Sequence, residues 1–251
     1  MKHLTDFTIV RRRQLGESYF ALTLQHPDRL PAIAAGQFVE VEVRHCREVM
    51  LRRPISIHDA DPAANTLTLL IQVVGRGTRQ LATLREGDTL NLIYPLGNGF
   101  GLLGQNPLLV GGGAGIAPLL YLAKCYHRQG VRPTLLLGGR TEALIPVRNE
   151  FEPYGTVYYA TEDGSLGERG LVTQHTAFQQ QYDHIATCGP TPMMKAVAQE
   201  ALQRGIGCEV SLENMMACGI GSCLCCVTDT TEGHKCVCKE GPVFDAKTLK
   251  M

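Results

Sequence analysis

The chain has 251 residues, of which 44% are hydrophobic and 19% charged, and its formal net charge is zero. These values are typical of a globular protein with ample apolar material for one large or several small domains. Because no basic surplus exists, we expect neither nucleic acid nor an anionic membrane surface among its partners.

The amino-terminal residues 1–13 (MKHLTDFTIVRRR) lack the apolar core of a signal peptide. The longest apolar stretch, residues 107–123, is interrupted by four glycines and an internal proline. Such a stretch is too short and too broken to span a bilayer. We therefore expect a cytoplasmic protein without membrane segments.

Short apolar alternations separated by turn signals fill residues 1 to about 100. The clearest are 37–43 (QFVEVEV), 66–74 (TLTLLIQVV) and 88–94 (DTLNLIY). Alternation with period two predicts strands, and short strands at this spacing indicate a small antiparallel barrel or sandwich.

Two segments of this first region carry phosphate-binding chemistry. Arg52–Ile57 (RRPISI) lies between two predicted strands, and a guanidinium fork suits pyrophosphate oxygens. Gly75–Thr78 (GRGT) precedes a helix-compatible stretch at 79–84 and suits a phosphate at a helix amino terminus. Taken alone, Arg52–Ile57 also fits a surface arginine pair, and Gly75–Thr78 also fits a plain tight turn. Both segments in this order are a more specific signal for a phosphate-bearing cofactor than either one.

Residues 107 to about 205 alternate apolar strands with helix-compatible stretches, which predicts a parallel α/β sheet. Helices are expected at 116–129 and 191–205, and one further helix in each of the two connections between the intervening strands.

The sequence 111–118 (GGGAGIAP) follows a strand and opens a helix, so its bare backbone N–H groups suit a dinucleotide phosphate. It is not a G-x-G-x-x-G fingerprint, and Gly138–Arg140 stands where that fingerprint places an acidic ribose ligand. A related nucleotide-binding sheet is therefore the better interpretation. Cys188–Pro190 (CGP) ends a later strand at the same edge, where Cys188 fits either a site residue or a core thiol.

Six of the ten cysteines fall within residues 218–238. The spacing Cys-x4-Cys-x2-Cys followed by a distant cysteine matches the plant-type [2Fe–2S] pattern, and Gly219 and Gly221 allow the backbone to approach such a core closely. Structural zinc usually takes paired Cys-x2-Cys knuckles, so zinc is the less favoured alternative. Spacing alone does not choose between Cys236 and Cys238 as the fourth ligand.

The order RPIS, GxGT, GGGAGIAP, CGP and then this cysteine pattern resembles the ferredoxin–NADP reductase superfamily. Within it, LRRPISI (51–57), PLGNGF (95–100), CGPTPMMKAVA (188–198), SLENMMACGIGSC (211–223) and CKEGPVF (238–244) resemble the electron-transfer subunits of class 1B dihydroorotate dehydrogenases. The resemblance covers nearly the whole chain. It implies an antiparallel FAD-binding barrel (1–101), a parallel α/β NAD-binding domain (102–206) and a small C-terminal [2Fe–2S] domain (207–251).

The resemblance also implies site residues. FAD contacts fall on Arg53, Pro54, Ile55 and Ser56, on Leu70, Ile71 and Gln72, and on Gly77 and Thr78. The nucleotide-binding glycines are Gly112, Gly113 and Gly115. The cluster ligands are Cys218, Cys223, Cys226 and Cys238, the last assigned by the CKEGPVF ending, which leaves Cys225 and Cys236 without a ligand role.

The implied partner is an FMN-containing catalytic subunit that oxidises dihydroorotate, in a two-plus-two heterotetramer of pyrimidine biosynthesis. The implied role is electron transfer between that FMN and NAD through the cluster and FAD, with NAD as a diffusible acceptor or donor and no acid–base residue of the chain taking part. Arg140 leaves open whether the nucleotide is NAD or NADP, since an arginine at this position suits a 2′-phosphate. Two alternatives remain: a reductase subunit of another NAD(P)-linked complex, of the ferredoxin:NADP oxidoreductase or sulfhydrogenase type, and a zinc-bearing binding module.

Overall fold

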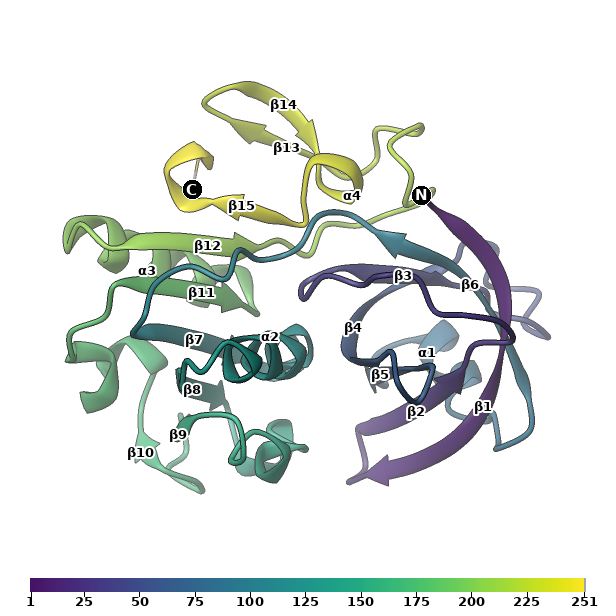
Figure 1. Cartoon of the computed structure of the whole chain (residues 1–251), viewed down its shortest axis with the longest axis horizontal. Helices are drawn as coiled ribbons and strands as arrows, with labels where there is room; N and C mark the ends of the chain where they lie inside the picture. Colours follow the sequence, from purple (N-terminus) through teal and green to yellow (C-terminus); the bar gives the residue numbers. More distant parts are fainter. Residues whose placement is uncertain (251) are drawn as a thin grey trace.

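The computed structural model describes residues 1–250, and its first part is a closed antiparallel barrel with strand order β1-β2-β5-β4-β3-β6 (Figure 1). The strands are β1 (His3–Leu15), β2 (Tyr19–Gln25), β3 (Phe38–Val41), β4 (Arg53–Asp61), β5 (Thr66–Gln72) and β6 (Thr89–Leu96). The short helix α1 (Arg76–Leu81) follows β5. The predicted barrel is confirmed, although RPISI begins strand β4 itself and does not connect two strands.

The second part is a seven-stranded sheet with order β10-β9-β8-β7-β11-β12-β15. Its strands are β7 (Pro107–Gly112), β8 (Thr134–Gly139), β9 (Thr156–Thr161), β10 (Glu168–Arg169), β11 (His184–Cys188), β12 (Gly207–Ser211) and β15 (Val243–Asp245). All neighbours pair in parallel except β12 and β15. Helices α2 (Ala117–Arg128) and α3 (Thr191–Gln203) link β7 to β8 and β11 to β12. The predicted parallel α/β sheet is confirmed.

The helices predicted in the two remaining connections are wrong. The chain between β8 and β9 forms only the 3-10 turns η2 (Glu142–Leu144) and η3 (Arg148–Glu150), and η4 (Val172–Gln174) and η5 (Thr176–Gln179) precede β11. In the first connection Pro146 and Pro153 lack the backbone N–H that a longer helix needs. No helix within residues 1–250 is both long and apolar enough to cross a membrane.

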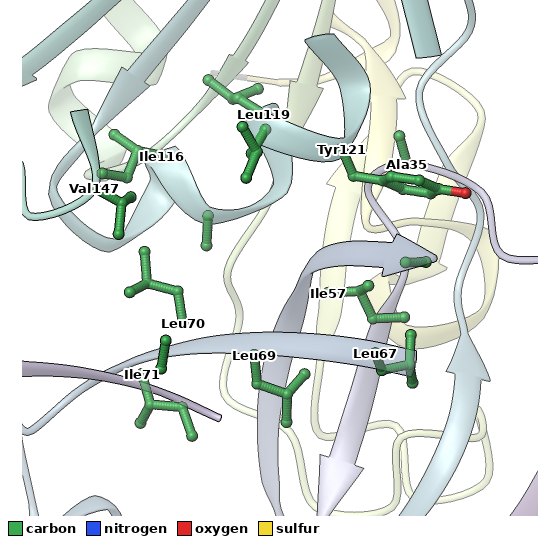
Figure 2. Close-up of a cluster of buried hydrophobic side chains, with 14 of the residues drawn as sticks. Ala35, Ile57, Leu67, Leu69, Leu70, Ile71, Ile116, Leu119, Tyr121 and Val147 are labelled. Carbon is green, nitrogen blue, oxygen red and sulfur yellow. The ribbon is translucent and has the colours of Figure 1, made fainter. Parts of the chain in front are cut away.

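The barrel and the sheet share one hydrophobic core. Ile57 and Leu69 on the barrel side and Leu119 on α2 belong to the same buried cluster, and all three are fully inaccessible to solvent (Figure 2). The 3-10 turn η1 (Gly113–Ile116) before α2 contributes Ile116 to this cluster. Because close-packed interiors resist rearrangement, this shared core holds the two units in a fixed relation.

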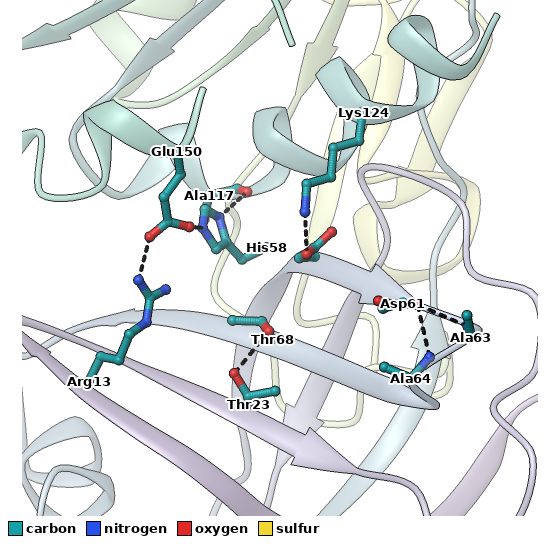
Figure 3. A network of polar contacts seen from close by, with 11 residues as sticks. Arg13, Thr23, His58, Asp61, Ala63, Ala64, Thr68, Ala117, Lys124 and Glu150 are labelled. Atoms are coloured by element: carbon teal, nitrogen blue, oxygen red, sulfur yellow. Dashed lines mark hydrogen bonds and ion pairs between the residues drawn. The ribbon is translucent and has the colours of Figure 1, made fainter. Parts of the chain in front are cut away.

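Polar contacts at the same junction join β1 and β4 to the opposite unit (Figure 3). The Arg13 guanidinium donates to Glu150 in η3 at 2.6 Å, and the Glu150 carboxylate also lies 3.5 Å from Nε2 of the buried His58. Nearby, Lys124 in α2 forms an ion pair with Asp59 at 2.6 Å. Partial burial alone would raise the pKa of Glu150, but His58 and Arg13 together hold it at about 2.

We expect Glu150→Gln to destabilise the fold by about 1–2 kcal/mol at neutral pH, allowing for screening of a side chain that is 30% exposed. Because the folded-state pKa lies below the ordinary 4.5, this stabilisation is fully present above pH 4.5 and is lost as the pH falls toward 2. Urea unfolding at pH 7 and pH 3 measures it. The exposed neighbour Glu152→Gln serves as the control. An equal effect of Glu150→Gln at both pH values contradicts this origin.

The carboxyl-terminal part packs across the end of the barrel and the edge of the sheet (Figure 1). It contains a hairpin of β13 (Val227–Thr230) and β14 (Gly233–Cys236), the short helix α4 (Val237–Glu240) and the turn η6 (Ala246–Thr248). Val237 and Phe244 pack against Phe38 and Leu96 of the barrel in a small separate core. This part is thereby fixed to both of the other units.

Candidate functional site

A cavity of about 580 Å³ lies at the carboxyl edge of the parallel sheet. Its wall includes Gly112, Gly113 and Gly115 from the end of β7 and the turn that follows, together with Gly189 after β11. Because glycines have no side chains, this wall leaves backbone N–H groups accessible in the way that a phosphate-binding turn requires. The structure therefore brings the three predicted nucleotide-binding glycines together in one site.

The opposite wall of the cavity comes from other parts of the chain. Tyr19 and Gln72 are paired neighbours on the barrel strands β2 and β5, and Glu213 follows β12. The buried Tyr19 hydroxyl has no hydrogen-bond partner among the described residues, and burial together with the nearby Glu213 charge raises its pKa to about 12. The cavity is thus a junction between the sheet, the barrel and the chain that leads to the cysteines.

Cys188 and Glu213 meet beside this junction. The Cys188 thiol donates to a Glu213 carboxylate oxygen at 3.8 Å, and burial raises the pKa of both groups. Glu213 lines the cavity, and its side chain is exposed. Cys188 itself is fully buried, so it is a core thiol in contact with a site residue.

The two adjacent arginines of β4 and its approach have different roles. Arg52 donates to the backbone carbonyls of Glu40 and Asn91 at 3.2 Å and to the Asn91 side chain at 2.6 Å, which fixes it as a structural residue. Within residues 1–250 the Arg53 guanidinium hydrogen-bonds only to the nearby Leu51 carbonyl, at 3.2 and 3.4 Å, which leaves donors available to a ligand. A side chain at Gly77 would lie 3.2 Å from the Arg53 stem, so this glycine makes room for the arginine.

The remaining residues implied for FAD lie around Arg53. Pro54, Ile55 and Ser56 are half-buried on β4, and the Thr78 hydroxyl accepts the Val74 and Gly75 N–H groups at 2.9 and 3.1 Å. Of the β5 segment, Leu70 and Ile71 are buried in the barrel core, whereas Gln72 reaches the cavity. The barrel face from β4 to α1 thus combines the Arg53 guanidinium, the Ser56 hydroxyl and a close backbone approach at Gly77, which fits a bound pyrophosphate-bearing flavin.

The four cysteines implied as ligands lie in two contacting pairs. Partial burial opposes ionisation of Cys218, but hydrogen bonds from Ile220 and from the backbone and thiol of Cys223 lower its pKa to about 6. Burial and the neighbouring Cys226 thiol raise the pKa of Cys238 to about 12. Metal loading of this second pair must therefore release a proton.

Three of these four thiols lie in residues 216–226, called the cysteine loop below. This loop has the backbone conformation that the sequence predicts. Gly219 and Gly221 adopt φ values of 65° and 86°, which favour glycine. The Gly221 N–H donates to the Cys238 sulfur at 3.1 Å, and the Cys238 N–H donates to the Cys226 sulfur at 3.4 Å. The predicted approach of backbone N–H groups to the sulfurs is confirmed.

Among residues 1–250, no three His, Cys, Asp or Glu side chains converge tightly enough to surround a single metal ion. Structural zinc takes four ligands converging on one tetrahedral centre. Two separate thiol pairs, linked by sulfur-directed N–H groups, fit a two-iron core better, because each pair suits one iron atom. The Cys236 backbone N–H is bound instead to the Glu240 carboxylate at 2.7 Å, and Cys225 is exposed.

Two segments match known protein families. Residues 213–250 match the iron–sulfur cluster binding domain of dihydroorotate dehydrogenase B, and residues 109–199 match the oxidoreductase NAD-binding domain. The electron transfer subunit of dihydroorotate dehydrogenase B (NAD⁺) from Lysinibacillus sphaericus is 39% identical, with 97% of each chain covered. The chain belongs to this family of electron transfer subunits. The Fusobacterium nucleatum member is 34% identical, with 99% of each chain covered.

Solved structures agree with this family membership. A structure of NADH-dependent reduced ferredoxin–NADP oxidoreductase aligns with a TM-score of 0.87 and 30% identity, covering 97% of this chain and 89% of that one. A ferredoxin NADP⁺ reductase from Neisseria gonorrhoeae with bound FAD and NADP shares the fold, with a TM-score of 0.67 and 19% identity. The ferredoxin–NADP reductase fold, an NAD-binding domain and an iron–sulfur binding domain are therefore established for this electron transfer subunit.

Several residues of the site escaped the sequence analysis. Tyr19, Glu162 and Glu213 line the cavity, yet the sequence analysis assigned none of them to the site, although Glu213 lies within the quoted stretch 211–223. Glu162 follows strand β9, where a signal was available: a carboxylate at the carboxyl end of a parallel strand lies at the ligand-binding edge. Tyr19 has no comparable signal in the sequence, because its place in the cavity depends on how the barrel packs against the sheet.

Proposed function

We propose that this electron transfer subunit connects a nicotinamide dinucleotide to an FMN-containing, dihydroorotate-oxidising partner through FAD and a [2Fe–2S] cluster bound to its own residues. The observation that carries the proposal is the shared cavity, in which nucleotide-binding glycines face barrel residues Tyr19 and Gln72. Two cofactors must meet for electrons to pass between them, and this cavity is where the two binding units meet.

The proposed FAD site is the barrel face formed by β4, β5 and α1. Arg53 supplies the guanidinium for the pyrophosphate, Ser56 a hydroxyl and Gly77 a close backbone approach, and Pro54, Ile55 and Thr78 complete the face. On β5, Gln72 is the residue positioned for direct contact. Leu70 and Ile71 are buried in the core, so we assign them the task of supporting that strand.

The proposed cluster ligands are Cys218 with Cys223 on one iron and Cys226 with Cys238 on the other. The contacts within each pair support this division. The N–H groups that reach the sulfurs stabilise negative charge there and so favour the reduced cluster. When bound, FAD exchanges electron pairs with the nicotinamide and single electrons with the cluster, so the protein's task is to position the groups and exclude water.

We further propose that residues 1–101, 102–206 and 207–251 bind FAD, NAD and the cluster, respectively. Strands β12 and β15 of the third segment extend the sheet of the second and tie the two together. The proposed complex is a two-plus-two heterotetramer in the cytoplasm. Ten unpaired cysteines support a reducing compartment.

Anaerobic co-expression with the catalytic subunit tests the proposal. The purified complex should contain FAD, FMN, iron and acid-labile sulfide, and should reduce NAD⁺ with dihydroorotate. The catalytic subunit alone should not reduce NAD⁺. A complex without iron and sulfide contradicts the cluster, and NAD⁺ reduction by the catalytic subunit alone contradicts the electron-transfer route.

The structure also supports a preference for NADH over NADPH. Arg140 and Glu162 end the neighbouring strands β8 and β9 and both line the cavity. A carboxylate there accepts ribose hydroxyls and repels a 2′-phosphate. We expect Glu162→Gln to lower the NADH-to-NADPH ratio of kcat/KM by about tenfold, since a hydrogen bond to a charged group is worth about 1.5–3 kcal/mol.

Steady-state reduction of a dye by each nucleotide measures this ratio. Asp163→Asn is the matched control, because Asp163 is the next residue and its carboxylate binds the Ser165 hydroxyl and N–H instead. If the NADH-to-NADPH ratio of kcat/KM is unchanged in Glu162→Gln, then Glu162 does not determine the nucleotide preference.

A further inference from the structure

Glu40 is a buried carboxylate between the flavin-binding strand and the cysteine loop. It lies on β3 opposite Pro54 of β4, and its side chain is completely inaccessible to solvent. The flanking Val39 and Val41 belong to the barrel core, so alternation along the strand directs Glu40 to the other face. The carboxyl-terminal part of the chain covers that face.

The cysteine loop packs directly on the Glu40 side chain. A β-carbon at Gly219 would lie 2.5 Å from Glu40 Cγ and 2.9 Å from its Oε1. Gly219 immediately follows Cys218, so the carboxylate lies next to the backbone that carries a proposed iron ligand. Glycine at this position is what allows the loop and the carboxylate to approach each other.

Both carboxylate oxygens of Glu40 lack a hydrogen-bond partner within residues 1–250. The nearest cations are bound elsewhere, since Arg52 donates to carbonyls and to Asn91 and Arg53 donates to Leu51. An unpartnered buried carboxylate is costly, and structural needs of the barrel would be met by an apolar residue. Packing alone therefore does not explain a carboxylate at this position, and its charge is the property to account for.

Burial raises the pKa of Glu40 to about 7, against the lowering effect of the Arg52 and Arg53 charges. A pH above this value favours the carboxylate form. A charge in a region of low polarity acts strongly on its neighbours, because little water screens it.

We propose that the charge of the Glu40 carboxylate sets the reduction potential of the cluster, and thereby how one electron is distributed between the flavin and the cluster. This inference rests on the proposed FAD and cluster sites. An electron added to a bound cluster would increase the negative charge beside Glu40. The carboxylate would oppose this increase, so it would lower the cluster potential and favour transfer of the electron from the cluster to the flavin.

Redox titration of the co-expressed complex at pH 8.5, followed by electron paramagnetic resonance of the reduced cluster, tests the inference. Glu40→Gln keeps the size of the side chain and removes the charge. We expect the cluster potential to rise by an amount equal to at least a tenfold change in the one-electron equilibrium, which is about 59 mV. Glu42→Gln is the matched control, because Glu42 lies on the same stretch of chain and is paired with Arg44 at the surface.

Equal cluster potentials in wild type, Glu40→Gln and Glu42→Gln overturn the inference while leaving the proposed function intact. A wild-type complex without iron and sulfide instead overturns the proposed function. If Glu40→Gln purifies without a cluster, the comparison moves to Glu40→Asp and Glu40→Asn, which share a length and differ in charge. A higher potential in the asparagine variant supports the inference, and equal potentials refute it.

Discussion

Cys223→Ser is expected to abolish assembly of the iron–sulfur cluster and with it electron transfer between the partner subunit and NAD⁺. Serine offers a hard, protonated hydroxyl in place of a soft thiolate, which iron–sulfur cores require. Loss of an outer contact to a metal ligand already costs about 10- to 100-fold in metal affinity or activity, so loss of the ligand itself should exceed about 100-fold. Iron and sulfide analysis and dihydroorotate-dependent NAD⁺ reduction measure the two effects.

The position of Cys223 makes this experiment clean. Its side chain is exposed, so the substitution leaves no cavity in a core. Cys225→Ser is the matched control, because Cys225 is equally exposed and belongs to neither thiol pair. Cys238→Ser should lose the cluster, whereas Cys236→Ser should retain it. A full iron complement and normal activity in Cys223→Ser contradict the ligand assignment.

The sequence predicts the fold class because its signals are local. The alternations at 66–74 and 88–94 correspond to β5 and β6, and the glycine-ended strand before 111–118 corresponds to β7. The errors arise where long-range packing decides the structure. The connection between β8 and β9 forms only 3-10 turns, and yet it contains the fully buried Phe151. Tertiary packing satisfies an apolar residue there without a helix.

The cysteine loop shows how much of a site spacing can predict. The Cys-x4-Cys-x2-Cys pattern and its glycines predict the left-handed backbone found at Gly219 and Gly221, since that conformation is a local property. The pairing of Cys226 with Cys238 requires α4 to return to the loop, which spacing does not specify. Sequence patterns therefore predict which cysteines are candidate ligands better than they predict which of these cysteines contact one another.

Glu40 illustrates the converse. In the alternating stretch 37–43 a glutamate predicts a solvent-facing position, because a half-buried strand places polar residues outward. All four residues of β3 are in fact buried, since the carboxyl-terminal part of the chain covers the outer face. Only the packing of a segment more than a hundred residues away in the sequence converts an ordinary surface carboxylate into a candidate for control of electron transfer.

Gly115→Ala is expected to close the nucleotide site from within. A β-carbon at Gly115 would lie 2.4 Å from both the Cys188 carbonyl oxygen and the Gly189 Cα, and backbone atoms cannot rotate away. The turn after β7 must therefore move away from β11 and distort the cavity wall. Overpacking of this kind costs about 1–3 kcal/mol, so NADH affinity should fall by about 5- to 150-fold.

The flavin should remain bound in Gly115→Ala, because the barrel face with Arg53 is separate from this contact. Calorimetric titration with NADH and measurement of FAD content distinguish the two sites. Gly207→Ala is the matched control, since it lies in the same sheet at the opposite end of the strands, and among the described residues a β-carbon there would meet only the His184 ring, at 3.3 Å. Normal NADH affinity in Gly115→Ala would show that the nucleotide does not depend on the glycine-lined wall. Loss of FAD together with NADH would show instead that the barrel and sheet do not bind their cofactors independently.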